Sequence, residues 1–362
     1  MGHKKGYHPV RYWKINHIKE EKEMKRKSRL IVAFVVGLLL IISALSYGAE
    51  PKATVLRLAG LWPPLDPVTL QLQAFADKFN KQAGGKYVVE VHPGEELVKV
   101  MESIDAVRTG ASEMTGWPIG VFASLDRRFA AAEIPFLVNN VEGDAAMQVA
   151  LMPLYSQFME TKFNSKAIFS FTCLALDILS TKPVKTVADW KGLLVHSVSP
   201  QSAKFIEQIG GSAVPLPFPE GYDAIQKKVV AATMQSSSMM IMFKLNEVGK
   251  YVTRGYLIPA SIIIAVNMDA FKKMPKDVQN ALVEAGKKQQ KEANDYFIGV
   301  AQANTGTLTK LGVEVYNLPK AERDKWIEKV RPYSDSLLKG MDDFGKEVMK
   351  VAKEVNTKYP YK

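Results

Sequence analysis

Residues 202–228 read SAKFIEQIGGSAVPLPFPEGYDAIQKK, and this stretch decides the fold class. Apolar residues at helical spacing predict one helix over Ser202–Ile209 and another over Glu220–Lys228. Between them, Ala213–Pro215 is predicted as a short strand. Helix, strand and helix in succession are typical of an α/β fold, in which helices cover a sheet.

The same alternation continues along the rest of the chain. Strands are predicted over residues 54–59, 87–91, 167–172, 193–195, 261–267 and 313–316. The run SIIIAVN, residues 261–267, is rich in β-branched residues and predicts a buried strand. One helix is predicted to begin at Asp66-Pro67, a long one to cover residues 276–311, and two amphipathic ones to cover residues 320–353. We expect parallel strands covered on both faces.

The composition first suggests an anionic partner. The 362 residues carry a net charge of +11 and are 47% hydrophobic, which excludes a disordered or collagen-like chain. However, residues 1–49 hold ten Lys and Arg against three Glu, so residues 50–362 hold 38 basic and 34 acidic residues. These charges are interleaved on helix faces. The sequence therefore gives no support for nucleic-acid binding.

The N-terminal charge precedes an apolar run. Lys25, Arg26, Lys27 and Arg29 stand before LIVAFVVGLLLIISAL, residues 30–45, and small residues follow. This order predicts a secretory signal peptide, with cleavage after Ser46 or Gly48. An uncleaved membrane anchor is the alternative. Met24 makes a better start than Met1, so residues 1–49 are interpreted as an extension plus signal.

Chemistry-bearing motifs are sparse in the exported part. Cys173 is the chain's one cysteine, so no internal disulfide can form. His92 and His196 lie far apart, without the spacing of a metal site, and no nucleophile elbow or phosphate-binding loop occurs. We expect no metal, no cofactor and no enzymatic activity.

Several motifs, in order, resemble the solute receptors of tripartite ATP-independent periplasmic (TRAP) transporters, the DctP-like family. They are IDAVRTGASEMTG at 104–116, AEIPFLV at 132–138, STKPVKTVADWKG at 180–192, IGGSAVPLPFPEGYDAIQKK at 209–228, NEVGKYVT at 246–253 and NMDAFKKMPKDVQ at 267–279. The resemblance covers most of residues 53–350. The PLPF stretch, with Tyr222 and Gln226 behind it, is the most specific piece.

This resemblance implies a two-lobed periplasmic-binding-protein-like clamshell, each lobe a β-sheet flanked by helices, with a long helix bracing both. We expect residues 50–174 to begin lobe I, 175–260 to begin lobe II, 261–312 to return to lobe I with the bridging helix, and 313–362 to add a strand and helices. It also implies a periplasmic receptor that binds a small organic solute and delivers it to a membrane permease. Membrane contact is expected only through the permease or an uncleaved signal.

The chain departs from the family at its ligand clamp. The family has an Arg after the "DlkG" motif, and His196 occupies that position here. Gln235 stands where a second motif has Asn. A neutral His cannot make the bidentate contact of a guanidinium. The ligand is therefore neutral or weakly polar, or an anion held by protonated His196 with Gln235 and Ser197, or an anion held by another basic residue.

Further ligand-binding candidates follow strands near the expected cleft. Trp62 and Trp117 are aromatic wall candidates, Leu174 and Asp177 follow the strand at 167–172, and Ser236 either binds ligand or caps a helix. These residues favour an apolar, aromatic pocket and a ligand less acidic than a C4-dicarboxylate.

Two other functions use the same features. A sensor that reports its ligand to a signalling partner would share the clamshell. An exported hydrolase would need His196 beside a cleft serine, and its sign would be turnover of the bound substrate.

Overall fold

The computed structural model describes residues 22–29, 32, 34–36 and 53–362. The chain divides into two compact units, residues 1–52 and 53–362. In the first unit, residues 22–29 are helical, whereas the predicted cleavage region and residues 1–21 of the extension lie outside the described residues. Within the described ranges, every helix is too short or too polar to span a bilayer.

The first sheet of residues 53–362 has the order β2-β1-β3-β10-β4. Its strands are β1 (Thr54–Gly60), β2 (Tyr87–His92), β3 (Met114–Pro118), β4 (Ser165–Thr172) and β10 (Ser261–Asn267). The elements that belong to it are α2 (Pro67–Gln82), α3 (Ser103–Thr109), α4 (Val141–Lys162), α8 (Met268–Lys273), α11 (Asp342–Lys358), and the 3-10 helices η1 (Val100–Glu102), η2 (Ile119–Phe122) and η3 (Arg127–Glu133). We call this assembly lobe I.

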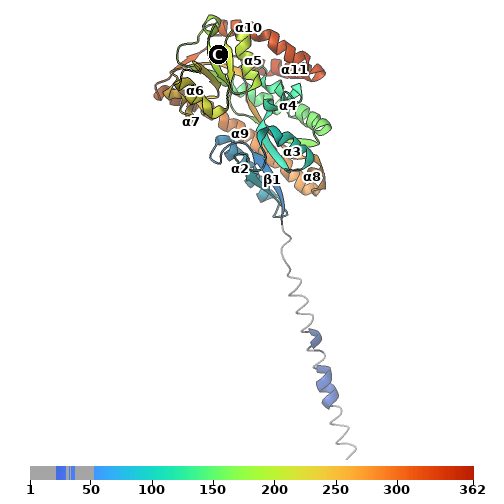
Figure 1. Cartoon of the computed structure of the whole chain (residues 1–362). Coiled ribbons are helices and arrows are strands. Elements are labelled where there is room, and N and C mark those ends of the chain that lie inside the picture. Colours follow the sequence, from blue (N-terminus) through green and yellow to red (C-terminus); the bar gives the residue numbers. More distant parts are fainter. Residues whose placement is uncertain (1–21, 30–31, 33, 37–52) are drawn as a thin grey trace, which may run out of the picture. The chain divides into compact units, whose positions relative to one another are not determined.

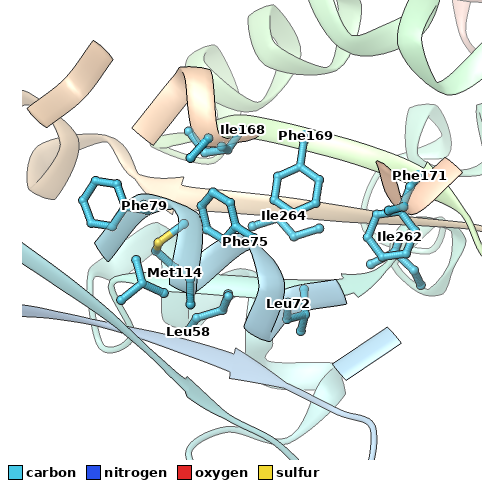
Figure 2. Packing of buried hydrophobic residues seen from close by; sticks show 14 of the residues in the cluster. Leu58, Leu72, Phe75, Phe79, Met114, Ile168, Phe169, Phe171, Ile262 and Ile264 are labelled. Atoms are coloured by element: carbon cyan, nitrogen blue, oxygen red, sulfur yellow. The ribbon is translucent and has the colours of Figure 1, made fainter. Parts of the chain in front are cut away.

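Strand β10 shows why the run SIIIAVN marks the centre of a sheet. All seven of its residues are buried. Ile262 and Ile264 point into the core beneath α2, where they meet Phe75 and Phe169 (Figure 2). Ile263 enters the core on the opposite face. A strand covered on both sides needs apolar residues at every position, which this run supplies.

The second sheet has the order β11-β9-β5-β8-β6-β7. Its strands are β5 (Leu176–Ser180), β6 (Leu194–Ser197), β7 (Ser212–Pro215), β8 (Ala232–Gln235), β9 (Tyr251–Ile258) and β11 (Glu314–Asn317). It carries α5 (Pro200–Ile209), α6 (Gly221–Gln226), α7 (Ser237–Met242), and the 3-10 helices η4 (Val187–Trp190), η5 (Phe218–Glu220) and η6 (Leu245–Glu247). We call this assembly lobe II. In Figure 1, α5, α6 and α7 lie around it, away from α2, α3 and α8.

The predicted parallel strands are present in both lobes, but neither sheet is parallel throughout. In lobe I, β10 runs antiparallel to β3 and β4. In lobe II, β5 runs antiparallel to β8 and β9. The reason is that the chain passes from one lobe to the other. Strands β5 and β10, which enter each lobe across the hinge, run against the other strands, whereas β4 and β9, by which the chain leaves, run with them.

Two segments cross the hinge, and two helices brace it. The chain passes to lobe II between Thr172 and Leu176 and returns between Ile258 and Ser261. Helix α9 (Lys276–Lys310) places apolar residues in the core beneath α2 and, near its end, Leu308 in a core of lobe II. Helix α10 (Lys320–Lys339) likewise contributes to cores of both lobes.

The C-terminal tail, residues 359–362, is pinned to both lobes. Asn140, at the start of α4, donates its Nδ2 to the Pro360 carbonyl at 3.1 Å. The Tyr361 hydroxyl donates to the Leu318 carbonyl, after β11, at 2.5 Å. The Arg323 guanidinium lies 4.3 Å from the centre of the Tyr361 ring. The tail is therefore a tie across the hinge.

Candidate functional site

The candidate site lies where the strands of both lobes end. In lobe II, β6 and β8 are parallel, with His196 opposite Thr233, so Ser197 and Gln235 stand at their carboxyl ends. In lobe I, β1 and β3 end at Gly60 and Pro118. In α/β sheets, ligands bind outside the carboxyl ends of the strands. Four strands therefore direct their ends toward one interlobe region.

A direct contact between the lobes passes through this region. Gln201, in the first turn of α5, donates its Nε2 to the carbonyl of Gly120 in η2 at 2.6 Å. The Gly120 N–H donates in turn to the Glu133 carboxylate at 3.1 Å. The segment after β6 thus contacts the segment after β3. Sequence reasoning missed Gln201, although the Ser-Pro-Gln helix start directly after a predicted strand could have indicated it.

His196 is fully engaged by the protein. Its ring is buried, its Nε2 lies 3.0 Å from the Leu216 carbonyl, and its Nδ1 lies 3.0 Å from the Thr233 hydroxyl. A carbonyl can only accept, so Nε2 carries the proton and Nδ1 accepts from Thr233. Burial lowers the pKa of His196 below its ordinary value. His196 is therefore a neutral structural residue. Its two hydrogen bonds connect the PLPF segment, residues 215–218, to strand β8.

Gly221 leaves the space that the His196 ring occupies. A Cβ at this first residue of α6 would stand 2.6 Å from His196 Nδ1 and 3.1 Å from Gln235 Nε2. His196 and Gln235 are therefore brought together beneath α6. Gln235 donates its Nε2 to the Phe218 carbonyl at 3.4 Å, while its buried Oε1 has no protein partner. Gln235 Oε1 is therefore a buried acceptor that the protein leaves unpaired.

We expect Gly221→Ala to disturb the site. The new methyl group would push the His196 ring away from Leu216 and Thr233, because 2.6 Å is far inside contact distance. Overpacking of this kind costs about 1–3 kcal/mol of unfolding free energy. Gly306→Ala on α9 is the matched control, since its Cβ would meet open space. Chemical denaturation measures the unfolding free energy of both variants. Equal values would contradict the structural role assigned to His196 and Gly221.

The other lobe II candidates have separate positions. Ser197 is buried, and its Oγ has no protein partner. It follows His196 on β6 and therefore points to the opposite face of the sheet. Ser236 caps α7, accepting the Met239 N–H. Ser197 is thus an unpaired polar group at the strand end, whereas the Ser236 hydroxyl is used by the fold.

The two tryptophans belong to lobe I. Trp117 is fully buried, packs edge-on against Phe122 at 5.4 Å, and leaves its indole Nε1 without a partner. Trp62 is 6% exposed and joins the core beneath α2. Trp62 follows β1 as expected, whereas Trp117 lies within β3, and both rings lie in packed cores.

Leu174 and Asp177 lie at the hinge. Leu174 is in the crossing segment, buried and with a positive φ of 78°. Asp177 accepts the Gly255 N–H at 3.1 Å and lines a cavity of about 550 Å³ that contains none of the other seven predicted site residues. Burial raises the pKa of Asp177. Asp177 stands directly opposite Gln235 on the neighbouring strand, and its carboxylate accepts the Gly255 N–H rather than a bond from Gln235 or His196.

The geometry defines a two-lobed α/β protein in which the segments after β3 and β6 meet between the lobes. Comparison with known proteins agrees. The sequence model of bacterial extracellular solute-binding protein, family 7 (DctP) matches residues 58–340, and the chain belongs to this family.

Relatives and solved structures of this family match most of the chain. The C4-dicarboxylate-binding periplasmic protein DctP of Rhodobacter capsulatus is 27% identical over 86% of this chain and 94% of its own. The 2,3-diketo-L-gulonate-binding periplasmic protein YiaO of Escherichia coli is 23% identical over 88% and 99%. Among solved structures, Bordetella pertussis DctP7, a receptor binding pyroglutamic acid, has a TM-score of 0.77 at 20% identity, covering 83% of this chain and 100% of that one.

Among the described residues, no three His, Cys, Asp or Glu side chains gather as a metal site would require.

Proposed function

We propose that this chain is a periplasmic receptor that closes its lobes on a small organic solute and delivers it to the permease of a TRAP-type transporter. The observation that carries the proposal is the family's two-lobed fold, with strand ends of both lobes directed at one contact, Gln201 to Gly120. Closure follows from ligand binding more tightly to the closed arrangement than to the open one.

The chain binds its solute without converting it. A hydrolase would need His196 as a base beside a serine, but both ring nitrogens are committed to Thr233 and Leu216. The expected result is therefore recovery of the bound solute unchanged. Mass spectrometry of the solute before and after incubation tests this, and a hydrolysed product would reject the receptor.

We further propose that the ligand is held without a charged His196. The relatives' names include a C4-dicarboxylate, a sugar acid and pyroglutamic acid, so the class is a small organic acid or a less acidic, aromatic analogue. Here, Gln235 and Ser197 supply hydrogen bonds, since their Oε1 and Oγ lack protein partners. A thermal-shift screen with organic acids, aromatic acids and neutral polar solutes identifies it by mass action.

Ligand affinity should not depend on His196 protonation. Because burial lowers the pKa of His196, the ring is neutral at pH 8 and stays more neutral at pH 6.5 than an ordinary histidine does. For the ligand found in the screen, we expect the same dissociation constant at pH 8 and pH 6.5. Calorimetric titration measures it. Tighter binding at the lower pH, abolished in His196→Gln, would restore the protonated-His196 hypothesis.

A further inference from the structure

The hinge holds a cavity whose lining includes Asp177, the cross-strand partner of Gln235, but not Gln235, Ser197 or His196 themselves. Its walls come from β5 and β9 near the hinge, from β11, from α9, from the start of α4, and from the end of α11 with the C-terminal tail. Its volume, about 550 Å³, lies within the range of about 300–1,000 Å³ typical of small-molecule sites. Six of its lining residues carry the argument: Asp177, Arg254, Tyr256, Thr305, Tyr359 and Tyr361.

One edge of the Arg254 guanidinium faces this cavity without a protein acceptor. Its Nη1 donates to the Thr305 hydroxyl. Its Nε lies 3.9 Å from Asp177 Oδ2, too far for a hydrogen bond. In the described part of the chain, Nη2 has no acceptor. The side chain is 28% exposed and lines the cavity, where its Nε forms a long ion pair with Asp177.

Asp177 does not depend on Arg254 alone. Its other oxygen, Oδ1, accepts the Gly255 N–H at 3.1 Å. A second acceptor at the guanidinium would therefore leave the carboxylate with its backbone partner. Tyr256, Tyr359 and Tyr361 supply flat apolar walls, and Lys358, Lys362 and Glu142 also line the cavity. A planar apolar body with one anionic group matches this combination.

We propose that the hinge cavity is a second binding site, for a small aromatic carboxylate. Its carboxylate would accept from Nη2 and Nε of Arg254, because a guanidinium binds a planar carboxylate through two parallel bonds. Its ring would lie among the three tyrosines. The site goes beyond the proposed function, since it shares no residue with the Gln235 and Ser197 end of the cleft.

The test uses calorimetric titration of the full exported chain with benzoate, and with benzamide as the uncharged analogue. Arg254→Gln removes the guanidinium. Gln302→Trp fills the cavity from the exposed side of α9 and leaves every charge in place. Arg108→Gln is the matched control, because Arg108 is an exposed arginine on α3. Gln235→Ala reports on the cleft. Melting temperatures check folding.

We expect saturable benzoate binding at millimolar concentration, weakened at least tenfold in Arg254→Gln and in Gln302→Trp and unchanged in Arg108→Gln. Benzamide should bind at least tenfold more weakly. If Arg254→Gln does not fold, loss of binding in folded Gln302→Trp supports the site. No saturable binding by the wild type overturns the proposal. So does benzoate binding that disappears in Gln235→Ala and survives both cavity variants, which would place benzoate in the cleft and leave the receptor function intact.

Discussion

Replacing Arg323 by Met should lower the unfolding free energy by about 3–5 kcal/mol, the cost of removing a buried, hydrogen-bonded charge. Arg323 is 3% exposed. Its Nε donates to the Gly255 carbonyl at 2.9 Å, its Nη2 to the Val138 carbonyl at 3.1 Å, and its Nη1 to Asn139 Oδ1 at 3.2 Å. Burial lowers its pKa to about 10. The substitution would leave these three oxygens unpaired where β9 meets the entry to α4.

Two further variants make this prediction specific. Arg323→Lys keeps the positive charge but loses the planar guanidinium that reaches three acceptors. Its unfolding free energy should therefore recover less than half of the loss seen in Arg323→Met. Arg331→Met, at an exposed position on the same helix, should change stability by less than about 0.5 kcal/mol. Urea denaturation measures all three. A loss in Arg323→Met as small as that in Arg331→Met would contradict the role assigned to these contacts.

The second large effect is a pH dependence of stability that comes from Glu133. Burial raises the pKa of this carboxyl to about 8 from an ordinary 4.5, with a smaller contribution from nearby Asp144. Between these values, the folded chain keeps a proton that the unfolded chain has released. Stability should therefore be complete below about pH 4.5 and fall as pH rises toward 8, by up to about 1.4 kcal/mol per pH unit.

Glu133→Gln should flatten this slope, because the amide cannot ionise but can still accept the Gly120 N–H. A smaller slope should remain up to about pH 6, since burial raises the pKa of Asp144 to about 6. Glu328→Gln, at an exposed position on α10, is the control and should leave the slope unchanged. Unfolding free energies from pH 4.5 to 8.5 measure the three proteins. The same slope in wild type and Glu133→Gln would refute the assignment.

The sequence predicted the elements whose patterns are local. Residues 276–311 were predicted as a long helix, and α9 covers Lys276–Lys310. The run at 261–267 was predicted as a buried strand, which is β10. Helix α4 was missed because its apolar residues are spread around the helix and Pro153 interrupts it. Strands β5 and β8 were missed because four- or five-residue runs carry little periodicity.

The candidate site was harder to predict, because it depends on contacts across the chain. The position of His196 in a family motif was visible, but its partner Leu216 lies 20 residues away and the room for its ring comes from Gly221. Asp177 was predicted to line the cleft because it follows the strand at 167–172, where the family lines its cleft. It lies opposite Gln235, and its carboxylate accepts the N–H of Gly255, 78 residues along the chain. Such pairings follow from the sheet order, which local patterns do not determine.

The pinned C-terminal tail determines where this protein can be labelled. A purification tag or fluorescent fusion appended after Lys362 would begin at the rim of the hinge cavity and pull on Tyr359 and Tyr361, which line it. A signal of lobe closure from such a fusion would also contain the effect of the fusion on the tail's contacts with both lobes. The exposed residue Gln82, the last of α2 in lobe I, has a helical backbone, unlike Gly84 and Gly85, whose positive φ would strain any other residue. A dye attached there would report lobe motion without disturbing the tail's contacts across the hinge.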